Sequence, residues 1–138
     1  MDNLTKERRS RIMSKVNTKN TTPELIIRKY LFSHGFRYRV NVRKLPGSPD
    51  IVLSKYKTVI FVNGCFWHGH SCRAGRKPQS NKSYWDKKIG DNIIRDHKNI
   101  EKLIMLKWKV IVVWQCEINT QVKGKERLEK LINEIKLQ

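Results

Sequence analysis

The densest group of reactive side chains lies between residues 47 and 72, GSPDIVLSKYKTVIFVNGCFWHGHSC. Asp50 opens the apolar run 51–53, and a second run, 58–62, leads into a loop at 63–72 that is rich in cysteine, histidine and aromatic residues. Both runs are rich in β-branched residues, which is typical of strands. If the two strands pair as a hairpin, Asp50 and the loop lie at the same end of the sheet.

The first chemistry that these residues suggest is metal binding. Cys65, His70 and Cys72 lie in the loop, and Cys116 follows a later apolar run. Three thiolates and one imidazole form a closed tetrahedral zinc set with no position for water, so this zinc would be structural. His68 could replace His70, but we favour His70 because it lies close to Cys72 and leaves His68 pointing elsewhere. The alternative is buried free cysteines and solvent-exposed histidines.

The second chemistry is phosphodiester hydrolysis, which needs an activated water and neutralisation of the transition-state charge. A Mg²⁺ ion held by oxygen ligands provides both, and Asp50 is the best candidate ligand. His68 is a candidate general base near neutral pH, and Asp96 could orient it. The alternatives are an ordinary turn aspartate at position 50 and an ion pair between Asp96 and a lysine or arginine.

These side chains need elements that position them, and the apolar patterns predict the order α-β-β-β-α-β-α. The expected elements are a helix at 22–35, strands at 38–42, 51–53 and 58–62, a helix at 83–106, a strand at 110–114 and a helix at 123–137. A long helix between the third and fourth strands predicts a crossover connection. The fold class is therefore α/β, with a central mixed sheet flanked by helices.

The first helix carries clear end signals. Thr22 is the expected N-cap, with Pro23 at the first helical position and Gly35 as the stop. Its expected buried face consists of Ile27, Tyr30, Leu31 and His34. Glu24 lies in the first turn, where the helix dipole favours an acid, so both a capping role and a catalytic role stay open.

The long helix at 83–106 has one apolar stripe. This stripe consists of Trp85, Ile89, Ile93, Ile100, Leu103 and Ile104. Asp96 falls on the same stripe by helical periodicity. An acid that faces inward needs a partner.

Charge indicates the partner of the protein. The 138 residues suffice for one domain with a core. Lys+Arg number 30 against 12 Asp+Glu, a net charge of +18, which points to nucleic acid. We expect residues 22–138 to form a single domain and residues 1–21 to form a basic arm that contacts DNA, or else a flexible tail. The basic loop at 73–82 is also expected to face DNA.

The sequence contains no apolar run of membrane-spanning length and no signal peptide, so we expect no membrane partner and a cytoplasmic location. Its three cysteines are an odd number. Thiols stay reduced in the cytosol, which favours metal binding over disulfides.

Several motifs together resemble the very-short-patch repair endonucleases over about residues 7–118. The most specific are LPGSPD at 45–50, VIF at 59–61 and GCFWH at 64–68, supported by KIG at 88–90, RD at 95–96 and VWQC at 113–116. The resemblance implies a restriction-endonuclease-like fold with a structural zinc site. It also implies Mg²⁺-dependent nicking on the 5′ side of the thymine of a T:G mismatch, which arises by deamination of 5-methylcytosine.

The resemblance also assigns roles to residues. Mg²⁺ would be bound by Asp50 and by the backbone carbonyl of Val62, and His68 would act on the water with Glu24 and Asp96 in support. The structural Zn²⁺ would be bound at Cys65, His70, Cys72 and Cys116. The residues implied to wedge into the base stack are Phe66, Trp67 and, from the arm, Met13. Phe66 and Trp67 could otherwise be core residues.

The chain departs from the family pattern in two places. Val62 stands where the family often has threonine, and Asn63 stands where it often has histidine. Asn63 could hydrogen-bond a phosphate of the DNA but cannot shuttle a proton. The acid and lysine usual on the second active-site strand of restriction enzymes are absent between residues 59 and 63.

We therefore expect a strand-specific DNA endonuclease that acts as a monomer on duplex DNA carrying a T:G mismatch. Mismatch-repair proteins are candidate partners, and the location is expected to be the nucleoid of a bacterial-type cytoplasm. Two rival readings stay open. One is a sequence-specific restriction-type nuclease of the same fold, and the other is a zinc-stabilised DNA-binding module without catalysis.

Overall fold

The computed structural model describes residues 22–72 and 80–137. The predictions for the arm at 1–21, including Met13, and for most of the basic loop at 73–82 therefore lie outside the described residues. No helix in the described part of the chain is both long and apolar enough to span a membrane.

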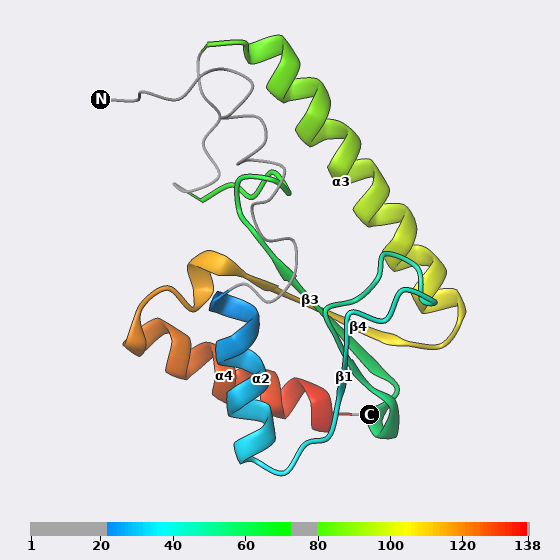
Figure 1. Ribbon diagram of the computed structural model, residues 1–138, viewed down its shortest axis with the longest axis vertical. Coiled ribbons are helices and arrows are strands. Elements are labelled where there is room, and N and C mark those ends of the chain that lie inside the picture. The colour runs from blue at the N-terminus through cyan, green and yellow to red at the C-terminus, as the bar shows by residue number, and fades with distance from the viewer. Residues whose placement is uncertain (1–21, 73–79, 138) are drawn as a thin grey trace.

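The centre of the fold is a four-stranded sheet in the order β1-β2-β3-β4 (Figure 1). The strands are β1 (Arg39–Val40), β2 (Ile51–Leu53), β3 (Thr58–Asn63) and β4 (Lys109–Trp114). Strands β1, β2 and β3 pair antiparallel, whereas β3 and β4 pair parallel. A parallel pair requires a long crossover, which α3 (Lys82–Met105) provides. The predicted α/β fold with a mixed sheet is confirmed.

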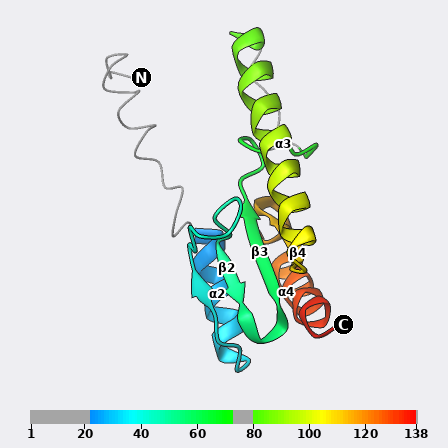
Figure 2. The same cartoon turned by 90° about the vertical axis from the view of Figure 1, so that its right-hand side faces the viewer.

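Helices cover both faces of the sheet. Alternate residues such as Ile51 and Ile60 pack against α2 (Thr22–Ser33) and α4 (Gln121–Lys136) in the larger core. Val52 and Val59, on the opposite face, pack against Leu103 of α3. Figure 1 shows α2 and α4 together and α3 running apart from them. The N-terminal half of α3 continues past the end of the sheet (Figure 2).

Helix α2 ends at a Schellman motif, as its glycine predicts. Gly35 has a φ of +84°, a conformation that glycine adopts without strain. Its N–H donates to the Phe32 carbonyl, and the Phe36 N–H donates to the Leu31 carbonyl at 3.0 Å. At the other end, Thr22 is already helical, so its assignment as N-cap is wrong; the residue before it lies outside the described residues.

Three other details differ from the sequence predictions. His34 is exposed, because it lies beyond the last helical turn and its ring folds back to the Tyr30 carbonyl at 2.9 Å. Ile104 is 56% exposed, since its neighbour Leu103 takes the buried position. The strand predicted at 38–42 ends at Val40, because Asn41 has a φ of 51° and leaves the extended conformation.

Candidate active site and metal centre

Strand register brings Asp50 to the end of β3. Ile51 pairs with Ile60 in the antiparallel β2–β3 ladder, so the chain just before β2 lies beside the last residues of β3. The Val62 N–H donates to Asp50 Oδ2 at 2.7 Å. The backbone carbonyl of Asp50 accepts from the Asn41 N–H at 3.1 Å. The hairpin therefore places Asp50 where the sequence predicts, at the sheet end that leads into the reactive loop.

A second acid from α2 approaches Asp50. Glu24 is only 1% exposed, and its Oε2 accepts from Arg28 Nη2 at 2.9 Å. Burial raises the pKa of Asp50 to about 7; the Val62 N–H opposes this rise, and the nearby carboxyl group of Glu24 adds to it. Two carboxyl groups in one enclosed place repel each other when both are ionised. Their oxygen atoms therefore suit a divalent cation such as Mg²⁺.

The inward acid of α3 has a histidine as its partner. Asp96 Oδ2 lies 2.5 Å from His68 Nδ1, and both side chains are partly exposed. This contact replaces the alternative of an ion pair between Asp96 and a lysine or arginine. With Nδ1 engaged by the carboxylate, Nε2 is the ring nitrogen available for proton transfer. Such an arrangement suits a general base oriented by an acid.

The loop that carries His68 is fixed against α3. Gly69 has a φ of +65°, and a Cβ at this position would lie 2.6 Å from Cδ1 of Ile93 and 2.9 Å from Cγ2 of Ile89. Only glycine therefore allows the loop to pass this close to the helix. Asn92 Nδ2 also donates to the Trp67 carbonyl at 3.0 Å. The helix thus positions the loop from both sides of His68.

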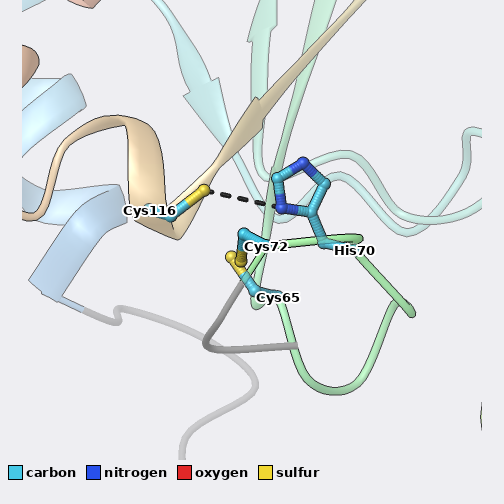
Figure 3. A group of neighbouring side chains, drawn as sticks. All are labelled: Cys65, His70, Cys72 and Cys116. Carbon is cyan, nitrogen blue, oxygen red and sulfur yellow. Dashed lines mark hydrogen bonds between the residues drawn. The ribbon is translucent and has the colours of Figure 1, made fainter. Parts of the chain in front are cut away.

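The four predicted zinc ligands come together. One ligand atom from each of Cys65, His70, Cys72 and Cys116 lies within 4.8 Å of the other three (Figure 3). Among the described residues, this group contains His70 and not His68. The parallel pairing explains the meeting, because Cys65 and Cys116 follow the paired residues Asn63 and Trp114 at equal distances along the chain.

The geometry and chemistry of this Cys₃His cluster fit a structural zinc ion. A Zn–S bond of about 2.3 Å in a tetrahedron implies ligand atoms roughly 3.8 Å apart, so small adjustments complete the site. Cys116 Sγ already lies 3.5 Å from His70 Nδ1. Burial raises the pKa of the Cys116 thiol to about 12, with the neighbouring cysteines adding to the rise, and burial also raises the pKa of Cys65. Thiols in this setting ionise at neutral pH only with a cation beside them.

Four aromatic rings form a separate cluster at the overhanging start of α3. Phe66 lies edge-on to Trp67 and to Trp85, each at a centroid distance of 5.1 Å, and Tyr84 lies 5.0 Å from Trp85. Tyr84 is 59% exposed. The two core clusters of the described residues contain none of these rings. Sequence reasoning missed Trp85 as a site residue, because helical periodicity places it on the apolar stripe.

Asn63 and Met13 are the other two residues predicted to contact DNA. Asn63 is 9% exposed at the end of β3, so its side chain is nearly buried. Met13 belongs to the arm and lies outside the described residues. The hypothesis that Met13 contacts DNA thus rests on the resemblance, and the hypothesis that Asn63 does so rests on the hydrogen-bonding capacity of its amide.

The fold and the site define an α/β protein whose sheet end carries paired acids, a histidine–aspartate pair and a zinc-type cluster. Residues 1–74 match the model of the family described as DNA mismatch endonuclease Vsr. The chain therefore belongs to the Vsr family of DNA endonucleases. The predicted resemblance is confirmed.

Curated relatives extend over most of the chain. It is 51% identical over 135 residues to the type II nicking enzyme V.NmeAIP of Neisseria meningitidis serogroup A, covering 98% of this chain and 96% of the relative. It is 44% identical over 132 residues to the type II nicking enzyme V.XorIIP of Xanthomonas oryzae pv. oryzae, covering 96% and 97%. It is 38% identical over 123 residues to DNA mismatch endonuclease Vsr of Escherichia coli, covering 89% and 76%.

The raised pKa of Asp50 predicts a pH-dependent gain in stability for Asp50→Asn in the absence of added Mg²⁺. The folded-state pKa is about 7 and the ordinary value is 3.8. The contribution of Asp50 to the free energy of unfolding is therefore fully present below its ordinary pKa of 3.8, and it is lost as pH rises through about 7. Asparagine carries no charge, so we expect its melting temperature to exceed that of the wild type by more at about pH 8 than at about pH 5.

Thermal unfolding followed by circular dichroism measures this difference. Asp91→Asn is the matched control, because Asp91 is an exposed aspartate of α3. If the melting temperatures of the wild type and Asp50→Asn differ by the same amount at both pH values, the raised pKa of Asp50 is contradicted.

The Cys₃His cluster predicts one Zn²⁺ per chain, and Cys116→Ser should lose it. Because metal-binding free energy is also folding free energy, this variant should melt at a lower temperature. Elemental analysis and thermal unfolding test both effects, with the exposed His97→Ala as control. Purified wild-type protein that is fully folded and contains no zinc would rule the site out.

Proposed function

We propose that this endonuclease nicks one strand of duplex DNA on the 5′ side of the thymine in a T:G mismatch, using Mg²⁺. The observation that carries the proposal is that two acids, Asp50 and Asp96, each make a contact at the end of the sheet where β3 ends. Asp50 contacts Val62, and the chain runs on from β3 to His68, which contacts Asp96. Family membership supports the same reaction.

The residues that would hold Mg²⁺ are Asp50, through its carboxylate, and Val62, through its backbone carbonyl. When bound, the ion supplies charge neutralisation and activation of water at the reacting phosphate. Glu24 adds a second negative charge beside Asp50 and is held in place by Arg28. Its role is to strengthen the attraction of this position for a cation.

His68 is the proposed general base. The Asp96 carboxylate accepts from Nδ1–H, which fixes the tautomer and leaves Nε2 to take the proton from the attacking water. The oxygen of that water bonds to phosphorus as one P–O bond of the strand breaks. The carboxylate of Asp96 then stabilises the imidazolium that forms.

The aromatic cluster is the proposed mismatch reader. Phe66 and Trp67 are braced by Trp85, so the three rings act as one rigid group rather than as separate side chains. A wedge of this kind enters a base step at a cost of a few kcal/mol, which is least where pairing is already weak. A T:G wobble is such a step. Met13 of the arm would fill the gap from the other groove.

Positive charge supports DNA as the substrate. The net charge is +18, and α3 presents an exposed basic row. This row consists of Lys88, Arg95, Lys98 and Lys102. The proposal includes the arm at 1–21 as a further DNA contact, the single domain at 22–138, and a monomer that acts on DNA in the cytoplasm. Mismatch-repair proteins are its proposed partners.

A second candidate function is nicking of intact duplex DNA at one specific sequence. The names of the relatives from Neisseria and Xanthomonas, both called type II nicking enzymes, favour it. A comparison of mismatched and intact substrates separates the two candidates.

Nicking assays on otherwise identical T:G and T:A duplexes, with and without Mg²⁺, test the proposed reaction. We expect nicking of the T:G duplex only with Mg²⁺, on the thymine strand. Asp50→Ala should abolish nicking, while DNA binding measured without Mg²⁺ persists, because in the metal-free protein removing a negative charge does not weaken attraction to phosphate. His68→Ala should slow nicking by about 10²–10⁴-fold, whereas His97→Ala should not. Equal rates on T:G and T:A would favour the second candidate instead.

The aromatic cluster predicts a loss of discrimination. Phe66→Ala, Trp67→Ala and Trp85→Ala should each lower the ratio of nicking rates on T:G and T:A duplexes, with zinc content unchanged. Phe32→Ala is the matched control, because Phe32 is an exposed phenylalanine on the distant α2. If all three variants keep the wild-type ratio, the mismatch is read by another part of the protein.

A further inference from the structure

One indole, that of Trp114, contacts both histidines of the reactive loop. It stacks on His70 at a centroid distance of 4.2 Å with an interplanar angle of 17°. It also meets the ring of His68 at 6.4 Å with an angle of 72°. These distances lie within or close to the range of favourable ring contacts. Trp114 therefore links the Cys₃His cluster to the proposed general base.

His68 needs more than its acid partner to hold a single orientation. The Asp96 contact fixes Nδ1 at one point, but the imidazole can still tilt about that point. Because His68 is partly exposed, solvent on its open side does not restrict this tilt. The indole of Trp114 provides a second contact, ring against ring at a centroid distance of 6.4 Å. The carboxylate and the indole together restrict the direction of Nε2.

Trp114 is itself rigidly held. As the last residue of β4 it pairs with Asn63 of β3, and its backbone N–H donates to Glu117 Oε1 at 2.7 Å. Glu117 Oε2 in turn lies 3.0 Å from Arg127 Nε of α4. Arg127 also donates to the Val112 carbonyl at 3.3 Å. The backbone of Trp114 is thus anchored to β3 and, through Glu117, to α4, which fixes the position from which the indole projects.

We propose that Trp114 is a positioning residue for the reaction, one that holds the His68 ring so that Nε2 stays aligned with the attacking water. This inference rests on the proposed role of His68 as general base. The alternative role for the same indole is to shield the metal cluster through its stacking on His70. The two roles differ in whether the effect of Trp114 depends on His68.

A double-mutant cycle separates these roles. Trp114→Leu should lower kcat by about 10- to 100-fold, as expected for a misplaced catalytic group, while KM stays within about twofold of the wild type. In the His68→Ala background the same substitution should lower kcat by no more than about twofold, because the group that it positions is absent. Trp114→Phe keeps a ring beside His68 and should recover most of the rate.

Zinc content and a matched control complete the experiment. Trp108→Leu removes an indole that packs against the core of Val52, Val59 and Leu103, and its effect should be equal in both backgrounds. Equal losses from Trp114→Leu with and without His68 would overturn the proposal, as would loss of zinc from Trp114→Leu. A normal rate in His68→Ala alone would remove the general-base role, and the positioning role with it. A slow His68→Ala with equal losses overturns only the positioning role.

Discussion

The meeting of four ligand atoms within 4.8 Å is the constraint on which the functional end of the molecule depends. It joins the irregular loop after β3 to the turn after β4, and this loop carries His68 together with Phe66 and Trp67. The parallel β3–β4 pair brings the two segments to one edge, and Gly69 lets the loop rest directly on α3. A metal ion at the cluster would then turn a short loop into a rigid platform, because its binding energy opposes every opening of that loop.

The functional end of the molecule contains two neighbouring acids, whereas the chain as a whole is strongly positive. The protein carries a net charge of +18, yet Asp50 and Glu24 lie together and burial raises the pKa of Asp50 to about 7. An acid pair of this kind lowers the stability of the metal-free protein at neutral pH. The same repulsion favours a divalent cation, so stability is lost where cation affinity is gained. The surrounding positive charge attracts the DNA that presents the reacting phosphate.

Much of this arrangement could be predicted from sequence, because it depends on local signals. A hairpin of two short strands brings Asp50 to Val62, and an inward acid on a long helix implies a partner, here His68. The ligand types alone indicated the Cys₃His cluster. Contacts that depend on tertiary packing were not predictable. Helical periodicity places Trp85 in the core because it contains no information on how far α3 extends past the sheet. It also places Ile104 in the core, because it does not distinguish Ile104 from its neighbour Leu103. In the sequence Trp114 has the pattern of an ordinary strand residue. Its contacts with His68 and His70 are seen only in the structure.

The central claim is that the Cys₃His cluster organises the loop proposed to carry out catalysis and to read the mismatch. Titration of Zn²⁺ into metal-depleted protein, with nicking of a T:G duplex followed at constant Mg²⁺, tests it most directly. The account predicts a nicking rate that rises in proportion to bound zinc and reaches its maximum at one ion per chain. Metal-depleted protein that is folded and nicks at the full rate before any zinc is added would contradict it.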